Sequence, residues 1–270
     1  MKRICIAIFC LILLFLCACR QQSSQPTAYS RLMNGQIINW TEQEYPFSFG
    51  ENGTLFYSLG QMERQVPVEL EESSVPGLYA SDQILAVSYP SNDRLNVLTS
   101  RDNGKTWQEA SLPLEGNASW SCIGFTSESN GWLISCSFAG MGRETHILYK
   151  TTDGGQSWSP VESDLNDVCA RMLSCAGFLN DEVGFLGFRY ENDPIPTLFM
   201  TRNGGENWSP LTLEIPEEYA DCNATALSPI YENGQCILPV DFSNGEGTVV
   251  ETVYYISTDL GESFTIPSNA

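Results

Sequence analysis

The sequence has few basic residues and almost no histidine. Its 270 residues include 33 acidic side chains against 13 lysines and arginines, a formal net charge of −20, and a single histidine, His146. So few cations argue against a nucleic-acid-binding face and against a polybasic contact with anionic lipid. One histidine leaves little material for a histidine-rich metal site or a histidine relay, and no CxxC spacing indicates zinc. We therefore predict no nucleic-acid partner, no metal and no cofactor.

Long apolar runs are also scarce, and the one present lies at the N-terminus. After Lys2 and Arg3, residues 4–18 are apolar. This stretch is shorter than the roughly 20 residues of a membrane-spanning helix but typical of a signal peptide. It ends in the sequence Leu-Cys-Ala before Cys19, which resembles a bacterial lipobox. The resemblance implies that Cys19 carries a diacylglycerol and becomes the N-terminus; an ordinary secretory signal cut elsewhere is the alternative.

These features divide the chain into three parts. We predict a signal peptide with its lipobox over residues 1–19, a flexible tether over 20–30, and one folded domain over 31–270. The tether is expected because residues 20–27 are polar and low in complexity. A hydrophobic fraction of 42% and an aromatic fraction of 11% are typical of a folded protein. The implied location is the bacterial cell membrane, with the domain lipid-anchored and facing outside the cytoplasm.

Six of the ten cysteines remain once the signal peptide and Cys19 are set aside: Cys122, Cys136, Cys169, Cys175, Cys222 and Cys236. An even number in an exported chain favours disulfides, and buried free thiols are the alternative. Cys122 and Cys136 lie at equal distances from Ser129, the centre of a predicted hairpin, and are expected to face each other. Proximity in sequence pairs Cys169 with Cys175 and Cys222 with Cys236.

A short motif, S/T-x-D-x-G-x-x-W, occurs four times at a nearly constant period. Its defining residues are Ser100, Asp102, Gly104, Trp107, Thr151, Asp153, Gly155, Trp158, Thr201, Asn203, Gly205, Trp208, Ser257, Asp259, Gly261 and Phe264. An Asp or Asn side chain can close a turn by accepting a backbone N–H two residues on, and glycine supplies a positive φ. The hydroxyl can bond across the turn, and the aromatic residue opens the next strand. A reaction needs one constellation, so four copies indicate structural turns.

The motif resembles the Asp-box, or BNR repeat, of sialidase-like propellers and their non-enzymatic relatives. The pattern Gly124-Phe125 followed by a Gly-aromatic-Leu triplet recurs at Gly177-Phe178. This longer repeat looks more like the propellers related to photosystem II assembly factors than like catalytic sialidases. The resemblance implies an all-β fold, a β-propeller of four-stranded blades in which each Asp-box joins the third strand (c) to the fourth (d). Five blades are expected over residues 31–270.

Alternating apolar patterns between turn signals place the strands of each blade. The expected ranges are 54–58 and 65–70 in a degenerate first unit; 78–81, 84–89, 95–100 and 106–112; 122–126, 131–138, 146–151 and 157–161; 172–178, 183–190, 197–201 and 207–211; and 224–231, 235–242, 249–257 and 263–267. The side chain of His146 is expected on the solvent-exposed surface of its strand.

The expected alternation of strands places the b–c and d–a loops on one face of the propeller, and by resemblance this is the usual binding face. Much of the acidic charge falls there, at Glu69, Glu71, Glu72, Glu115, Glu162, Asp164, Asp167, Glu214, Glu217, Glu218 and Asp221. Such a face can bind Ca²⁺. Because no stretch has D-x-D-x-D-G spacing, a solvated acidic surface is the favoured interpretation.

Three arginines, Arg94, Arg143 and Arg189, fall in or beside the b–c loops of three successive blades. Sialidases hold their substrate carboxylate with three arginines, so the resemblance makes these residues candidates for binding an acidic ligand. Tyr190 and Glu191 are then the candidates for a tyrosine–carboxylate nucleophile. The sequence lacks the Arg-Ile-Pro motif of sialidases and is short for six blades. Loop arginines offset by nearby acidic residues are the alternative.

The function expected from these features is that of a non-catalytic module. A lipid-anchored surface propeller would bind an envelope protein or glycan, or assist an assembly. One alternative is a glycoside hydrolase of sialidase-like type, which needs a pair of carboxylates. The other is a structural envelope protein without a ligand.

Overall fold

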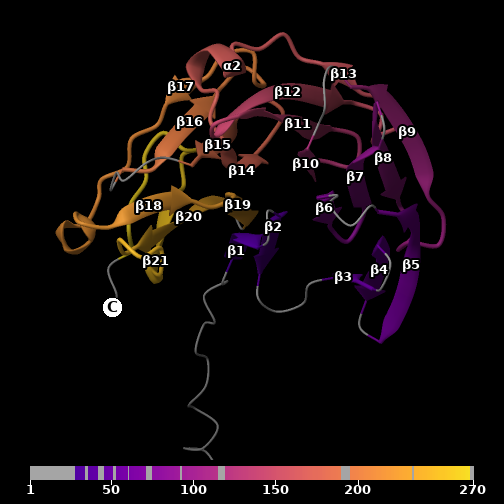
Figure 1. Ribbon diagram of the computed structural model, residues 1–270, viewed down its shortest axis with the longest axis horizontal. Helices are drawn as coiled ribbons and strands as arrows, with labels where there is room; N and C mark the ends of the chain where they lie inside the picture. Colours follow the sequence, from indigo (N-terminus) through magenta and orange to yellow (C-terminus); the bar gives the residue numbers. More distant parts are fainter. Residues whose placement is uncertain are drawn as a thin grey trace, which may run out of the picture.

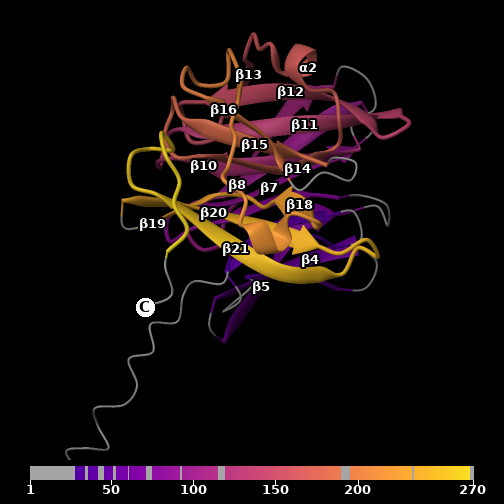
Figure 2. The ribbon, with the colours of Figure 1, turned by 90° about the vertical axis from the view of Figure 1, so that its left-hand side faces the viewer.

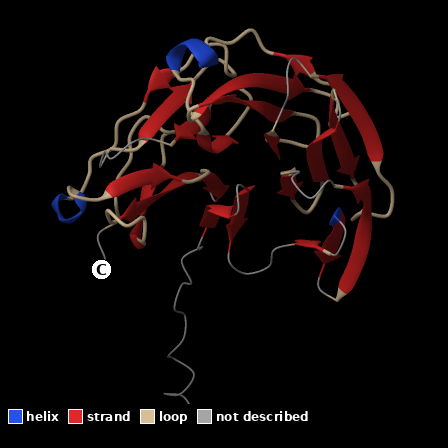
Figure 3. Ribbon diagram, viewed as in Figure 1, coloured by secondary structure: helices blue, strands red, loops and turns tan. Residues whose placement is uncertain are grey.

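The structure is a computed structural model that describes residues 28–267, apart from gaps at 34–35, 42–45, 51–52, 60, 71–74, 92, 115–118, 190–194 and 233. The predicted signal peptide, Cys19, and the candidates Tyr190 and Glu191 lie outside the described residues. Most of the described chain is strand, and helix is confined to short segments such as α2 (Leu165–Val168) and η2 (Glu217–Tyr219) (Figure 3). Within the described ranges, no helix is long and apolar enough to span a membrane.

Five antiparallel sheets follow one another along the chain, and we number them as blades 1 to 5. Blade 1 contains β3 (Phe47–Phe49), β4 (Thr54–Leu59) and β5 (Met62–Glu69). Blade 2 contains β6 (Gly77–Ala80), β7 (Leu85–Ser91), β8 (Arg94–Ser100) and β9 (Gln108–Pro113). Blade 3 contains β10 (Trp120–Phe125), β11 (Gly131–Gly140), β12 (Arg143–Thr151) and β13 (Ser159–Pro160). Blade 4 contains β14 (Leu173–Phe178), β15 (Gly184–Phe188), β16 (Thr197–Thr201) and β17 (Ser209–Pro210). Blade 5 contains β18 (Asn223–Ala226), β19 (Ile230–Glu232), β20 (Gln235–Ser243) and β21 (Val249–Ser257).

The blades are arranged around a common centre, with β6, β10 and β14 innermost (Figure 1). A separate hairpin of β1 (Ala28–Met33) and β2 (Gln36–Thr41) lies between the first and last blades, with β2 in contact with β6. The view turned by 90° shows β11, β12 and β21 running between the two faces (Figure 2). The prediction of an all-β, five-bladed propeller is confirmed.

The strand predictions fail in detail where proline falls. The expected inner strand over 224–231 is divided into β18 and β19, both paired with β20, because Pro229 has no N–H to donate to the sheet. The outer strands β13 and β17 contain only two residues each and end in Pro160 and Pro210. The expected outer strand over 263–267 is reduced to a single bridge between Ile256 and Thr265.

The hydrophobic core lies between neighbouring blades. All six residues of β10, and all six of β14, are buried, because each inner strand has a neighbouring blade on both sides. The Asp-box aromatics fill the outer part of these contacts. Trp158 packs edge-on against Phe125, Trp208 against Phe178, and Phe264 against Phe185, each with ring centroids 6.0 Å apart. The repeated motif therefore supports the packing of one blade on the next.

Candidate functional site

The first Asp-box is a turn closed by its own side chains. The Asp102 carboxylate accepts the backbone N–H of Lys105 at 3.0 Å and of Thr106 at 2.8 Å. The N–H groups lie three and four residues on, not two as predicted. The Ser100 hydroxyl donates to Asp102 and accepts the Gly104 N–H at 2.9 Å. Gly104 has φ of +74°, which glycine adopts without strain.

The bond from the N–H four residues on and the bond from the box glycine to the hydroxyl recur in the other three boxes, which also show one position that the motif did not include. The residue before the aromatic donates its hydroxyl to the box carboxylate: Thr106 to Asp102 at 2.7 Å, Ser157 to Asp153 at 2.6 Å and Ser263 to Asp259 at 2.6 Å. In the third box an amide pair replaces this bond, with Asn203 donating to Asn207 at 3.1 Å. All four turns are closed internally, which supports a structural role.

These bonds stabilise the ionised carboxylates. The Ser157 hydroxyl and the Ser157 N–H lower the pKa of Asp153 from 3.8 to about 2. Hydrogen bonds from Thr106 and from Ser263 likewise lower the pKa values of Asp102 and Asp259 to about 2. A carboxyl group whose pKa is lower in the folded than in the unfolded protein stabilises the fold above the unfolded pKa. That contribution is lost as the pH falls from about 4 toward 2.

We expect Asp153→Asn to lower the free energy of unfolding by about 1 kcal/mol at neutral pH, because the amide nitrogen cannot accept the Ser157 hydroxyl. Urea unfolding should show the difference from the unmodified protein shrinking between pH 4 and pH 2. Adding Ser157→Asn should restore much of the loss by copying the amide pair of the third box. Asp221→Asn, at an exposed loop carboxylate, is the control and should change little. A pH-independent loss would contradict the role of the charge.

The predicted acidic loops are exposed with one exception. Glu69, Glu162, Asp167, Glu214, Glu217, Glu218 and Asp221 are exposed, and Glu71, Glu72 and Glu115 lie outside the described residues. Asp164 is partly buried and accepts the backbone N–H of Trp208 at 3.0 Å, so it caps the Asp-box of the next blade. Its neighbour Ser163 donates to the Gly205 carbonyl of the same box. This part of the loop joins blades 3 and 4.

The three predicted arginines occupy the expected ends of their strands. Arg94 begins β8 and donates to the hydroxyl and carbonyl of Ser111 on β9 at 2.9 and 2.7 Å. Arg143 begins β12, Arg189 follows β15, and all three residues are exposed. Within the part of the chain that is described, no hydrogen bond or ion pair joins any two of them.

The six cysteines predicted to form disulfides are free thiols. In the register of β10 and β11, Cys136 faces Trp120 while Cys122 faces Ile134, because the turn is centred one residue before Ser129. The other predicted pairs are separated by packing. Cys169 packs against the core between blades 3 and 4, whereas Cys175 lies in the core between blades 4 and 5. Cys222 and Cys236 also belong to different clusters. Burial raises the pKa of Cys175 and of Cys236 to about 12.

The prediction for His146 is wrong, because its side chain is buried, with 2% exposed. Strand β12 begins at Arg143, three residues earlier than expected, and Glu144, His146 and Leu148 are all buried. The alternation with Leu148 was the available signal, since residues two apart point to the same face of a strand. This alternation was missed because residues 139–145 were predicted to form a loop.

A pocket of about 590 Å³ is lined by all five blades, at the inner hairpin turns of blades 2 to 5 and at the end of β4 in blade 1. Every blade contributes a large apolar or aromatic side chain to its lining. These are Tyr57 and Leu59 from blade 1, Tyr79 from blade 2, Phe125 from blade 3, Phe178 from blade 4 and Tyr231 from blade 5. The a–b turns lie on the Asp-box face, opposite the loops on which binding was predicted.

The described lining of the pocket combines polar and apolar surface and has little charge. Asp82 is the only charged side chain among the described residues that line it. Burial raises the pKa of Tyr57, and the nearby Asp82 carboxylate raises it further. Tyr79 is oriented by its hydroxyl, which donates to the Phe125 carbonyl at 3.2 Å. Half-exposed Leu59 and Tyr231, at 49% and 48%, contribute to the lining from blades 1 and 5. The recurring Gly-Phe pairs marked these hairpins, but the sequence did not show that they meet.

Comparison with known proteins relates part of the chain to a known family. Residues 99–229 match the model of the family described as Photosynthesis system II assembly factor YCF48. This part of the chain resembles the YCF48-type β-propellers of that family. The match covers the end of β8, the Asp-box and β9 of blade 2, blades 3 and 4, and the start of blade 5. No curated protein matched the chain.

Solved structures similar to this propeller include enzymes and a peptide complex. The GH74 enzyme of Niastella koreensis is 12% identical with a TM-score of 0.48, over 82% of this chain and 35% of that one. A structure of YCF48 bound to D1 peptide is 13% identical with a TM-score of 0.44, over 82% and 76%. The NanB sialidase of Streptococcus pneumoniae is 11% identical with a TM-score of 0.44, over 83% and 40%. The chain thus spans about a third of the GH74 enzyme.

Proposed function

We propose that this propeller is a non-catalytic binding module that takes an apolar segment of a partner protein into its central pocket. The observation that carries the proposal is the lining, to which all five blades contribute apolar or aromatic side chains. Burial of such surface favours binding by about 25 cal/mol per Å². The matched family is described as an assembly factor, and assembly requires contact with another protein.

The pocket favours a protein segment over the other expected ligands. Glycan sites present several polar groups that fix the orientation of hydroxyls, whereas the largest described side chains of this lining are aromatic or aliphatic. Glycoside hydrolysis uses two carboxylates roughly 5 to 10 Å apart. Among the described lining residues, Asp82 is the only carboxylate. With a net charge of −20, the protein also favours a partner segment flanked by basic residues.

Site-specific photo-crosslinking tests this proposal in the native envelope. A photo-reactive amino acid at Tyr231, in the pocket, is expected to give discrete protease-sensitive adducts. The same amino acid at Val250, also on blade 5 and 56% exposed but outside the pocket lining, should give none. Adding Leu59→Glu in the pocket lining should abolish the Tyr231 adducts. Equal labelling from both positions, or adducts sensitive to glycosidase but not protease, would overturn the proposal.

We also propose that the propeller is anchored to the outer side of a bacterial cell membrane by a lipid on Cys19. The support is the lipobox-like sequence that ends the N-terminal apolar run. Cys19→Ser should abolish labelling by a fatty-acid analogue and release the protein from membranes, whereas Cys17→Ser should not. Membrane retention of Cys19→Ser without lipid would refute this anchor.

A further inference from the structure

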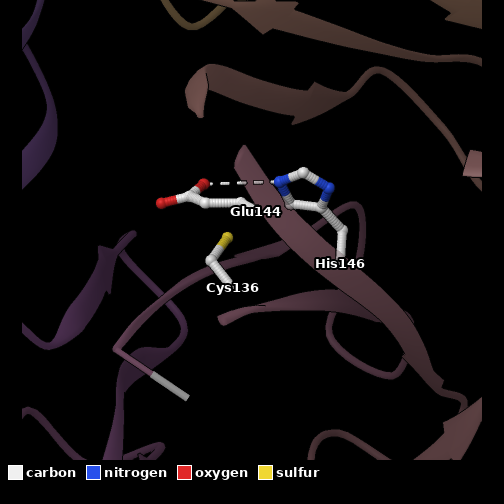
Figure 4. A group of neighbouring side chains, drawn as sticks. All are labelled: Cys136, Glu144 and His146. Atoms are coloured by element: carbon white, nitrogen blue, oxygen red, sulfur yellow. Dashed lines mark hydrogen bonds and ion pairs between the residues drawn. The ribbon is translucent and has the colours of Figure 1, made fainter. Parts of the chain in front are cut away.

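One group of buried side chains in blade 3 combines three types of metal ligand. Cys136 on β11 and His146 on β12 are directly paired in the strand register, and Glu144 lies two residues before His146. Their side chains converge on the same side of the sheet (Figure 4). A thiol sulfur, a carboxylate oxygen and an imidazole nitrogen, one from each, all lie within 4.8 Å of one another. The exposed fractions are 0%, 1% and 2% for Cys136, Glu144 and His146.

The spacing of His146 and Glu144 suits two ligands of a tetrahedral ion better than a hydrogen bond, and the Cys136 sulfur lies within 4.8 Å of both. His146 Nε2 lies 3.4 Å from Glu144 Oε2, which is long for an N–H···O hydrogen bond. Zinc bonds of about 2.0–2.3 Å place two ligand atoms roughly 3.3–3.6 Å apart in a tetrahedron. The other ring nitrogen, Nδ1, is buried and has no hydrogen-bond partner among the described residues. Within the described chain, His146 Nε2 itself has only the long contact with Glu144, which a metal bond would replace.

Glu144 is held in place by groups outside the triad. Trp120 Nε1 donates to Oε1 at 2.8 Å, and the backbone N–H of Leu173 on blade 4 donates to Oε2 at 3.0 Å. Bonds of this kind orient a ligating carboxylate from outside the first coordination shell. The carboxylate thus has a fixed position in the core between blades 3 and 4.

The charges of the triad also match a divalent cation. A buried carboxylate is costly without a compensating charge, and the only ion pair of Glu144 among the described residues is with His146. Metal binding deprotonates a cysteine ligand and uses a neutral imidazole. One thiolate and one carboxylate then carry two negative charges, which a divalent ion would neutralise inside the core.

We propose that Cys136, Glu144 and His146 bind one zinc ion that stabilises the contact between blades 3 and 4. Zinc accepts sulfur, nitrogen and oxygen ligands together, and a site closed to solvent is typical of structural zinc. The surrounding cluster also contains Cys122, but its sulfur is not among the ligand atoms that lie within 4.8 Å of one another, so the described residues supply three ligands. The site is separate from the central pocket, whose lining includes none of the three ligands.

Metal analysis of the full chain tests the proposal. Protein produced with zinc and purified without chelators should contain about one zinc per chain. Replacing zinc with Co²⁺ should produce a thiolate-to-cobalt charge-transfer band in the unmodified protein, and added zinc should bleach it. Removal of the metal should lower the melting temperature. A zinc content below a tenth per chain together with no cobalt band would overturn the proposal.

Variants locate the ion. Cys136→Ser and His146→Gln should each lose the cobalt band and at least tenfold in zinc affinity. Cys236→Ser is the matched control, because Cys236 is an equally buried thiol on β20 of blade 5, which pairs with its neighbours as β11 does in blade 3. This control should retain both zinc and band. An equal loss in Cys236→Ser, or zinc retained in folded Cys136→Ser and His146→Gln, would contradict the assignment. If a triad variant fails to fold, the cobalt titration of the unmodified protein decides.

Discussion

Replacing Glu144 by alanine is expected to lower the free energy of unfolding by about 4 kcal/mol, the largest effect of a single side chain in this core. The change leaves the indole N–H of Trp120 and the backbone N–H of Leu173 buried without an acceptor. Each unpaired buried donor costs about 1–3 kcal/mol, and the change leaves two of them. Urea or thermal unfolding in the presence of a chelator measures this effect without any contribution from bound metal.

Two further variants sharpen this measurement. Glu144→Gln keeps one acceptor oxygen but turns an amide N–H toward one of the two donors, so we expect an intermediate loss of about 2 kcal/mol. Glu182→Ala, at an exposed carboxylate, should change stability by less than about 0.5 kcal/mol. A loss at Glu144 as small as that at Glu182 would show that the buried network contributes little.

The second large effect is expected at a box glycine. Gly205 has φ of +98°, and a Cβ added there would overlap Leu148 of the preceding blade. The positive φ costs about 1–2 kcal/mol for alanine, and overpacking of a core adds about 1–3 kcal/mol. We therefore expect Gly205→Ala to lower the free energy of unfolding by about 3 kcal/mol, measured by urea unfolding.

A substitution at Gly142 measures the cost of backbone strain without the cost of overpacking. It also has a positive φ, +73°, but a Cβ there would meet nothing within 4 Å. Gly142→Ala should therefore cost about 1 kcal/mol, from strain alone. Equal losses at the two glycines would mean that the close approach between blades at Gly205 contributes nothing to stability.

The close contact between a box glycine and the preceding blade recurs, and it explains the constant period of the motif. Gly155 stands against Thr99 of blade 2, Gly205 against Leu148 of blade 3, and Gly261 against Phe185 of blade 4. Each box thus touches the preceding blade as well as closing its own turn. A repeat that serves both purposes must keep its spacing, since each blade buries its faces only against its neighbours.

Local chemistry explains why the turns were predictable and the disulfides were not. The box residues Ser100, Asp102 and Gly104 form hydrogen bonds with one another within a few residues. Their pattern in the sequence is therefore enough to predict the turn. Pairing of cysteines depends instead on the register of neighbouring strands and on which face a strand presents. A shift of one residue in a turn changed the partner of Cys136 from Cys122 to Trp120.

The buried triad was missed for a similar reason. His146 and Glu144 are polar residues near a turn, where solvent exposure is the usual outcome. The strand begins earlier than its apolar residues indicate, so both side chains point into the contact between blades. Only the packing of blade 4 on blade 3 brings the Leu173 N–H to the carboxylate and buries it.

The sequence by itself determined the class of fold, the repeated turn and the expectation of five blades. These depend on contacts between residues close along the chain, which leave a periodic pattern. The tertiary structure decided the central pocket, the free thiols and the buried Cys136–Glu144–His146 group. Each of these joins residues from different strands or blades, and closure around the axis sets their distances. No local pattern encodes that closure, because it results from burying every blade against the next.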